Sequence, residues 1–136
     1  MEPVFEAEIT PGMSPLDAVD LGVQVEAAGF HRLGVSCVAL WPDTYQIQTL
    51  IADRTKKIQI GPMVTNPYTR HVGVHASAIA TLQEVSNGRA FMGIGVGAGL
   101  EELGFDYNKP VQTLRETVMA FRQLLSGEET TIRGEP

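Results

Sequence analysis

A strand pattern followed by a helix pattern occurs four times along this chain, at nearly regular intervals. The strand patterns begin near Val4, Arg32, Ile58 and Ala90. Each unit is therefore roughly thirty residues long, which is the length of a βα unit in a parallel sheet. Sequence identity between the units is negligible, so the repetition is structural. The pattern predicts four consecutive βα units in residues 1–136, forming a single α/β domain.

Capping and turn residues mark the ends of the predicted helices. The first helix begins with Ser14 as its N-cap and Pro15 at its first position, and it stops at Gly29. The other helices have boundaries of the same kind, which are Asp43 for the second, the turn Asn87-Gly88 for the third, and Pro110 and Gly127 for the fourth.

Four βα units are compatible with two architectures. One is an open, doubly wound sheet, in which the strands are buried as continuous apolar runs. The other is half of an eight-unit (β/α) barrel, which leaves two strand edges to be completed by four further units. Composition and periodicity leave both possibilities open.

Composition narrows the functional class. The chain has 43% hydrophobic residues and a net charge of −6 with only 10 Lys and Arg residues, which argues against nucleic acid or an anionic membrane as a partner. Apolar runs are too short to span a bilayer, and the N-terminus lacks the basic start of a signal peptide. The single Cys37 excludes an internal disulfide and suits a reducing compartment. A cytoplasmic location is expected.

The fourth strand pattern contains alternating glycines from Gly93 to Gly99. Because side chains alternate across a strand, one face of this segment is bare backbone, which is typical of close approach by another group. Gly93, Gly95 and Ala98 also satisfy a dinucleotide-binding fingerprint. That fingerprint must open directly into a helix, whereas here a loop precedes Pro110, so the dinucleotide interpretation fails.

Four segments occur in an order that resembles the luciferase-like monooxygenase superfamily. They most resemble its branch that uses the deazaflavin coenzyme F-420, the methylenetetrahydromethanopterin reductase-like enzymes. The segments are Glu26–Phe30, Gly61–His71, Ala80–Arg89 and Gly93–Gly97. The resemblance covers essentially the whole chain and implies a TIM barrel of roughly twice this length, so that residues 1–136 are expected to form its N-terminal half.

The resemblance also implies where the coenzyme lies. In the family, the third strand ends in a bulge with a non-proline cis peptide bond behind the coenzyme ring, and the matching bond is Met63–Val64. Thr65 and Asn66 follow as polar groups at the C-terminal end of that strand. Backbone contact with the ring is expected from the end of the glycine-rich segment, whose residues are Gly95, Val96, Gly97 and Ala98.

Two departures from the family concern its acid–base groups. The second strand of the family commonly ends in Ser-Asp-His, whereas this chain has Ser36-Cys37-Val38. The fourth strand of the family is commonly followed by an acid that donates a proton beside the ring, and that position is Ala98. A thiol could carry a proton if its pKa were lowered, but nothing basic adjoins Cys37 in sequence, which favours an inert thiol. The catalytic residues therefore stay unassigned.

Other polar and aromatic residues have weaker claims to a site. His71 and His75 have a spacing that can hold a metal, but no third ligand lies near them in sequence, so capping or helix-surface roles are expected and no metal site is predicted. The remaining candidates are the loop carboxylates Glu101 and Glu102, the anion-binding candidate Arg70, and Trp41 and Tyr45, which could line a pocket mouth or pack in the core.

Three functional hypotheses follow. The first is an oxidoreductase that transfers a hydride between coenzyme F-420, or alternatively FMN, and an organic small-molecule substrate. The second is a non-catalytic half-barrel that assembles with a second copy or with a complementary C-terminal half. The third is that residues 1–136 are a fragment of a longer enzyme and need no cofactor of their own.

Overall fold

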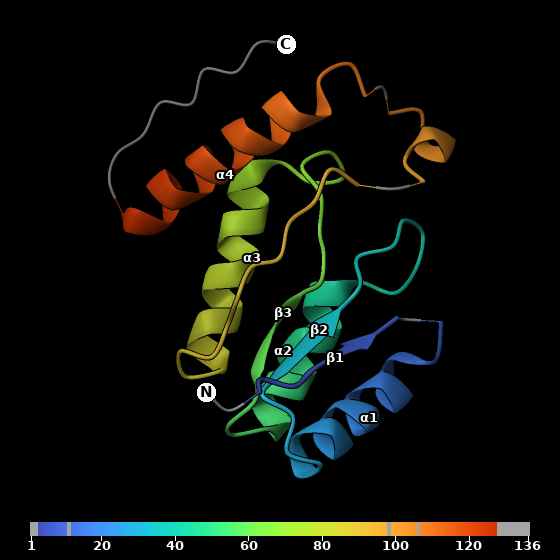
Figure 1. Ribbon diagram of the computed structural model, residues 1–136, viewed down its shortest axis with the longest axis vertical. Coiled ribbons are helices and arrows are strands. Elements are labelled where there is room, and N and C mark those ends of the chain that lie inside the picture. The colour runs from blue at the N-terminus through green and yellow to red at the C-terminus, as the bar shows by residue number, and fades with distance from the viewer. Residues whose placement is uncertain (1–2, 11, 98, 106, 128–136) are drawn as a thin grey trace.

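The computed structural model describes residues 3–10, 12–97, 99–105 and 107–127. Strands and helices alternate along the chain; the first three helices lie beside the sheet, whereas the last one packs across the third helix (Figure 1). The strands are β1 (Glu6–Ile9), β2 (Arg32–Val35) and β3 (Gln59–Pro62). The helices are α1 (Pro15–Ala27), α2 (Thr44–Arg54), α3 (Val72–Val85) and α4 (Pro110–Ser126), with a short 3-10 turn η1 (Glu101–Leu103) before α4.

The three strands form a parallel sheet in the order β1-β2-β3. Glu6 pairs with Arg32, and Arg32 pairs with Gln59, so neighbouring strands start in register. Each helix packs against the next one along the chain, as in the outer ring of a barrel. This arrangement confirms the prediction of sequential parallel βα units.

The predicted capping residues start the first two helices. The hydroxyl of Ser14 accepts a hydrogen bond from the Asp17 N–H at 3.2 Å, and Pro15 occupies the first turn of α1. The carboxylate of Asp43 accepts from the N–H groups of Tyr45 and Gln46 at 3.0 and 3.1 Å. These side chains satisfy backbone donors that a helix start otherwise leaves unpaired.

The hydrophobic core lies between the sheet and its helices. Ile9, Leu33, Val35 and Ile60 point toward the helices and are at most 3% exposed. Gly22 brings α1 close to α2, because a Cβ at that position would stand 2.9 Å from three side-chain atoms of Ile51. The opposite face of the sheet carries polar residues, which are Glu6, Glu8, Arg32, Ser36 and Gln59.

The fourth strand forms only in part. The glycine-rich segment pairs with β3 through two isolated parallel bridges, Ile60–Ala90 and Thr65–Ile94. Thr65 lies five positions after Ile60, whereas Ile94 lies only four after Ala90. One extra residue on the β3 side is a β-bulge, which interrupts the ladder and explains why a continuous strand is replaced by an extended segment.

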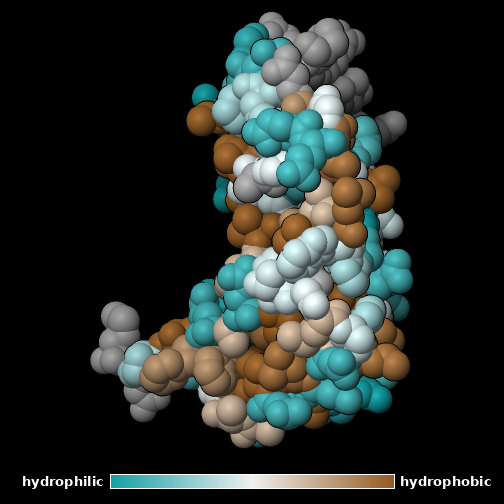
Figure 2. All heavy atoms as spheres, turned by 90° about the vertical axis from the view of Figure 1, so that its right-hand side faces the viewer, coloured by the Kyte–Doolittle hydropathy of each residue, from teal (hydrophilic) through white to brown (hydrophobic). Residues whose placement is uncertain are grey.

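Hydrophobic side chains are exposed over several parts of the surface, and Figure 2 shows some of them gathered in the lower part of the face that it displays. Val4 and Phe5, at the start of the edge strand β1, are 60% and 56% exposed. Within the described part of the chain, no helix combines the length and the apolar character needed to cross a membrane.

Candidate functional site

The bulge of β3 lies beside the glycine-rich segment, at the C-terminal end of the sheet. The peptide bond between Met63 and Val64 is cis, as the resemblance implied. The Thr65 N–H donates to the Gly93 carbonyl at 3.0 Å, and the Gly95 N–H donates to the Thr65 carbonyl at 2.9 Å. The structure therefore brings together two segments that sequence reasoning had placed in one site.

The glycines of this segment have different roles. A Cβ on Gly93 would stand 2.5 Å from the Pro62 carbonyl oxygen, and a Cβ on Gly61 would meet the Phe91 carbonyl oxygen even more closely. These two glycines are needed because the two backbones approach each other. A Cβ on Gly95 would stand 3.1 Å from Cγ2 of Val64 and meet no other heavy atom within 4 Å, so Gly95 alone of the three is limited by a single side chain and not by backbone.

Gly97 has a conformational role as well as a packing role. Its φ of 90° is in the range that favours glycine, and a Cβ there would stand 3.2 Å from the Cβ of Asn66. The position predicted to follow it, Ala98, lies outside the described residues.

Two exposed apolar side chains adjoin Gly95, Val64 in space and Val96 in the sequence. The side chain of Val64 is 47% exposed and that of Val96 is 38% exposed, while Thr65 and Asn66 are buried at 0% and 3%. We call Val64, Gly95 and Val96 the floor. An exposed apolar surface with bare backbone fits one face of a planar aromatic ring, so the residues present are compatible with a flavin or deazaflavin.

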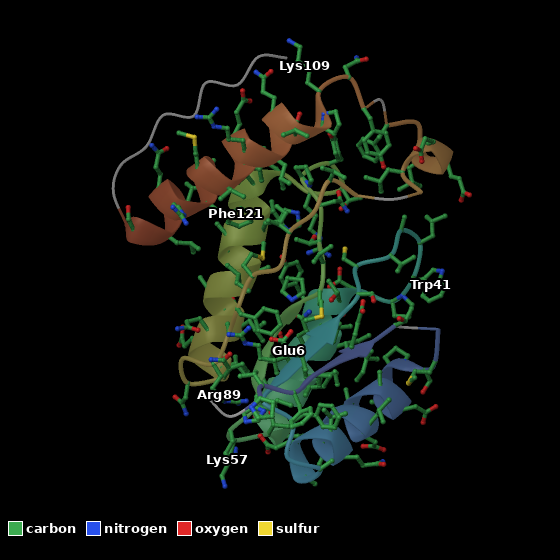
Figure 3. All side chains as sticks on the ribbon, in the orientation of Figure 1. Glu6, Trp41, Lys57, Arg89, Lys109 and Phe121 are labelled. Atoms are coloured by element: carbon green, nitrogen blue, oxygen red, sulfur yellow. The ribbon has the colours of Figure 1, made fainter. Side chains whose placement is uncertain are left out.

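The β2 loop supplies an apolar rim instead of acid–base groups. Cys37 is a half-buried free thiol, and Val38 is 38% exposed where the family has histidine. These residues line a cavity of about 200 Å³ together with Trp41 and Leu103. Figure 3 shows Trp41 on this loop, far from Lys57 and Arg89 at the N-terminal ends of the strands.

Glu8 is a candidate that the sequence reasoning missed. Its carboxylate accepts a hydrogen bond from the Ser36 hydroxyl at 2.5 Å, on the exposed face of the sheet. Glu8 pairs in register with Gly34, and a Cβ on Gly34 would collide with the Cβ of Met63, so the carboxylate and the bulge belong to one face. The alternating pattern of β1 predicts that Glu6 and Glu8 lie on the same face of the sheet, so the pattern alone does not single out Glu8. Glu6 forms an ion pair with Arg32, with 2.8 Å between Oε1 and Nη1.

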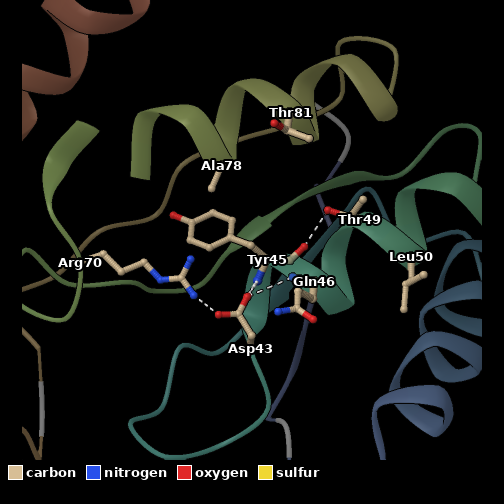
Figure 4. A pocket seen from close by; sticks show the side chains of 8 residues that line it. All are labelled: Asp43, Tyr45, Gln46, Thr49, Leu50, Arg70, Ala78 and Thr81. Atoms are coloured by element: carbon tan, nitrogen blue, oxygen red, sulfur yellow. Dashed lines mark hydrogen bonds and ion pairs between the residues drawn. The ribbon is translucent and has the colours of Figure 1, made fainter. Parts of the chain in front are cut away.

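A second cavity, of about 480 Å³, lies between α2 and α3 (Figure 4). Arg70 forms an ion pair with Asp43 there and lies over the ring of Tyr45, with 5.2 Å between the guanidinium carbon and the ring centroid. Arg70 is therefore engaged by two neighbours in the structure, an acid and an aromatic ring. Trp41 is 44% exposed, whereas Tyr45 is a core residue at 5%.

The two histidines of α3 separate into different environments. His71 caps the helix, with its Nδ1 accepting from the Gly73 N–H at 3.1 Å, as a capping role requires. His75 is fully buried and is not a helix-surface residue. Among the described residues, no group of three or more His, Cys, Asp or Glu side chains could hold a metal ion. Glu101 and Glu102 lie on η1 and are exposed.

Comparison with known proteins places this geometry in a family. Residues 3–136 match the luciferase-like monooxygenase family. The chain is 34% identical to 5,10-methylenetetrahydromethanopterin reductase of Methanolobus tindarius over 133 residues, covering 96% of this chain and 41% of the relative. It is 41% identical to the reductase of the same name from Archaeoglobus fulgidus, covering 96% of this chain and 40% of that protein. It is also 30% identical to an F420-dependent glucose-6-phosphate dehydrogenase of Amycolatopsis mediterranei, covering 89% of this chain and 41% of the dehydrogenase.

Solved structures agree with the sequence relatives. The coenzyme F420-dependent tetrahydromethanopterin reductase of Methanopyrus kandleri superposes with a TM-score of 0.89 at 30% identity, covering all of this chain and 43% of the reductase. The oxygenating constituent of 3,6-diketocamphane monooxygenase from Pseudomonas putida, in complex with FMN, superposes with a TM-score of 0.83 at 21% identity, covering 98% of this chain and 42% of that protein, which supports the fold alone. The chain spans about two fifths of the length of these relatives, and its fold is half of a (β/α)8 barrel. The chain belongs to the luciferase-like monooxygenase family.

Proposed function

We propose that this chain supplies the ring-binding half of an oxidoreductase that uses coenzyme F-420, with FMN as the second choice. The observation that carries the proposal is the floor: two exposed valines adjoin the backbone of Gly95, Val64 by packing against it and Val96 as the next residue in the sequence. It stands at the C-terminal ends of the strands, which is where barrel enzymes place their chemistry. Relatives named for F420-dependent reactions favour the deazaflavin over FMN.

The chain's own residues would bind and orient the ring. Val64 and Val96 would contact its apolar face, and Gly95 would allow close approach of the backbone. Gly97 would supply the backbone conformation at the end of the segment, and Met63, Thr65 and Asn66 would hold the bulge behind the ring. When bound, the deazaflavin supplies hydride chemistry, since that reactivity belongs to the cofactor and not to the protein. The organic substrate would enter from the rim of Cys37, Val38 and Trp41.

Proton transfer needs another group, because this chain has Cys37 and Val38, and Ala98, at the positions where the family commonly has acid–base residues. We assign it to Glu8, whose carboxylate faces the same side of the sheet as the bulge and is held by the Ser36 hydroxyl. A carboxylate held through Oε1 can accept or release a proton at its other oxygen, Oε2, without leaving its position.

The complete site requires a partner. The sheet ends at β1, whose outer edge has no neighbouring strand among the described residues, and its polar face lies open. A second copy or a complementary C-terminal half-barrel would pair with this edge and cover that face. The identities to longer relatives favour the complementary half.

The decisive experiment combines solution mass with cofactor titration. The purified chain is examined by analytical ultracentrifugation, alone and with added complementary half, and each preparation is titrated with oxidised F-420 and with FMN by fluorescence. We expect saturable binding of F-420, with an affinity at least tenfold higher than that for FMN. If neither compound binds to any assembly, the enzyme proposal is wrong.

A dimer that binds no cofactor would instead favour the non-catalytic assembly module.

Glu8→Gln tests the assigned proton carrier separately. The variant should bind F-420 with unchanged affinity and lose turnover with the complementary half present, because the amide keeps the shape of the carboxylate but not its titration. Unchanged turnover would remove Glu8 from the assignment.

A further inference from the structure

A buried hydrogen-bonded chain connects α2 and α3 to the end of the bulge. The Tyr45 hydroxyl lies 3.0 Å from Nδ1 of His75, and Nε2 of His75 lies 3.0 Å from the Asn66 carbonyl oxygen. Tyr45 is 5% exposed and His75 is 0% exposed. The imidazole therefore joins the other two groups by hydrogen bonds, and the Tyr45 hydroxyl has a weaker second contact, with Sδ of Met92 at 3.8 Å.

The partners fix the tautomer of His75. A carbonyl oxygen can only accept a hydrogen bond, so Nε2 must carry the hydrogen. In the neutral ring, Nδ1 is then the acceptor, and the Tyr45 hydroxyl is its donor.

The surroundings keep both groups in these protonation states. Burial and the charge of Arg70 lower the pKa of His75, and together they outweigh the opposing effect of the hydrogen bond to Asn66. Burial and the nearby Cys37 raise the pKa of Tyr45. At neutral pH the imidazole is therefore uncharged and the phenol is protonated.

Asn66 is held at both of its polar ends. Its side-chain Oδ1 accepts from the N–H groups of Tyr68 and Thr69, each at 3.0 Å, while its backbone oxygen accepts from His75. Asn66 directly follows Thr65, whose N–H and carbonyl pair with Gly93 and Gly95. The His75 imidazole thus binds the backbone of Asn66, directly beside the residue, Thr65, that is hydrogen-bonded to the glycine-rich segment.

We propose that His75 is a positioning residue, which holds the Asn66 carbonyl and thereby sets the backbone of Thr65 and Asn66 beneath the floor. Its consequence for cofactor affinity rests on the proposed function, whereas its consequence for the backbone does not. A residue that only filled space could be replaced by an apolar side chain of similar size. Such a replacement at His75 would remove the donor to the Asn66 carbonyl and the nitrogen acceptor of the Tyr45 hydroxyl, which would keep its weaker contact with Sδ of Met92 at 3.8 Å.

The first test uses the protein alone, without cofactor or partner. Nitrogen-15 NMR at pH 7 should show His75 as the neutral Nε2–H tautomer; an Nδ1–H tautomer or an imidazolium would overturn the proposal.

Amide exchange then compares His75→Leu with His75→Gln, whose side-chain N–H can still reach Asn66. In the leucine variant, the Tyr68 and Thr69 amides should exchange at least tenfold faster relative to β2 amides, and the glutamine variant should stay within threefold of the wild type.

Ile79→Ala serves as the matched control, because Ile79 is a buried residue one turn further along α3 that makes no side-chain hydrogen bond. It should lower global stability and raise exchange at Tyr68, Thr69 and β2 alike. If His75→Leu behaves like this control, or if His75→Gln exchanges as fast as His75→Leu, the positioning role is wrong.

The second test measures F-420 affinity of the same variants in the assembly that binds. His75→Leu should weaken binding about tenfold, with His75→Gln and Ile79→Ala close to the wild type. Equal affinity for all four proteins would contradict the link to the floor. If the wild type binds no F-420 or FMN, the proposed function fails, while the NMR and exchange results still decide the role of His75.

Discussion

Val64 lies directly against the bare backbone of Gly95, so that a Cβ on Gly95 would stand 3.1 Å from Cγ2 of Val64 and meet no other heavy atom within 4 Å. The equivalent position on Gly93 is already filled by the Pro62 carbonyl oxygen at 2.5 Å. Two glycines that are two residues apart in sequence are thus constrained differently, Gly95 by one side chain and Gly93 by the backbone of the neighbouring strand.

This difference gives a paired prediction for Gly95→Ala and Gly93→Ala. Gly93→Ala should destabilise the chain by about 2–3 kcal/mol, because the new methyl group must displace backbone. Gly95→Ala should cost under about 1 kcal/mol, because Val64 can rotate away. Urea unfolding followed by circular dichroism measures both values; equal losses would mean that Gly95 is as enclosed as Gly93.

Gly95→Val extends the prediction to the proposed site. A branched side chain would stand on the floor where a planar ring needs to lie, so F-420 binding should be lost while the unfolding midpoint changes little. Val111→Ala, in the first turn of α4, provides the control, since Val111 is 75% exposed and is not part of the floor. Undiminished affinity in Gly95→Val would place the ring elsewhere.

Glu26 should make stability depend on pH. Its carboxylate accepts from the backbone N–H groups of Lys56, Lys57 and Ile58 at distances from 2.7 to 3.0 Å. Burial raises the pKa of Glu26, but these three hydrogen bonds and the charge of Arg89 outweigh it and lower the pKa below 4.5. A lowered folded-state pKa means that this stabilisation is complete above the unfolded-state value and is lost as the pH falls through the folded-state value.

The wild type should therefore exceed Glu26→Gln by about 1 kcal/mol in free energy of unfolding at pH 7, and the gap should close on acidification below pH 4.5. Denaturant titrations at a series of pH values give the comparison. Glu102→Gln, at an exposed position on η1, is the control and should show no such gap. A gap for Glu26→Gln that persists unchanged to pH 3 would contradict the linkage.

Arg89 should be sensitive to a change that keeps its charge. Its guanidinium donates to the carbonyl oxygens of Ala52, Thr55, Ile58 and Ser86, at 2.6 to 3.0 Å. A lysine ammonium group cannot donate to all four carbonyl oxygens, because it lacks the planar, multi-donor shape of a guanidinium. Arg89→Lys should therefore lower the free energy of unfolding by about 2–3 kcal/mol. Arg122→Lys on the exposed side of α4 should change the thermal midpoint by less than the measurement error. Similar midpoints for the two variants would show that charge alone matters at Arg89.

The order of elements was predictable because it rests on local signals. Ser14, Asp43 and Gly127 mark helix ends through their own hydrogen bonds or backbone angle, and the structure confirms each of them. The burial pattern of α1 was less predictable. Leu16 fits the apolar periodicity yet is 68% exposed, because the close approach of α1 to α2 at Gly22 decides which side of the helix is buried.

The candidate site was predictable in its segments and not in its contacts. The resemblance placed the bulge at Met63–Val64 and the glycine-rich segment in one site, and the hydrogen bonds of Thr65 confirm that they are neighbours. It could not show that Gly93 is required by Pro62, or that His75 reaches Asn66, because both contacts depend on how separate elements meet. Glu8 was missed for the same reason, since alternation along β1 treats Glu6 and Glu8 alike.

The parallel order β1-β2-β3 has a consequence for synthesis on the ribosome. Every strand pairs with the strand that precedes it in the sequence, and every helix packs on its predecessor. No unit has to wait for a distant segment before it can dock. A growing chain can therefore consolidate one unit after another as it emerges, and no later unit has to form before the first can fold against the second.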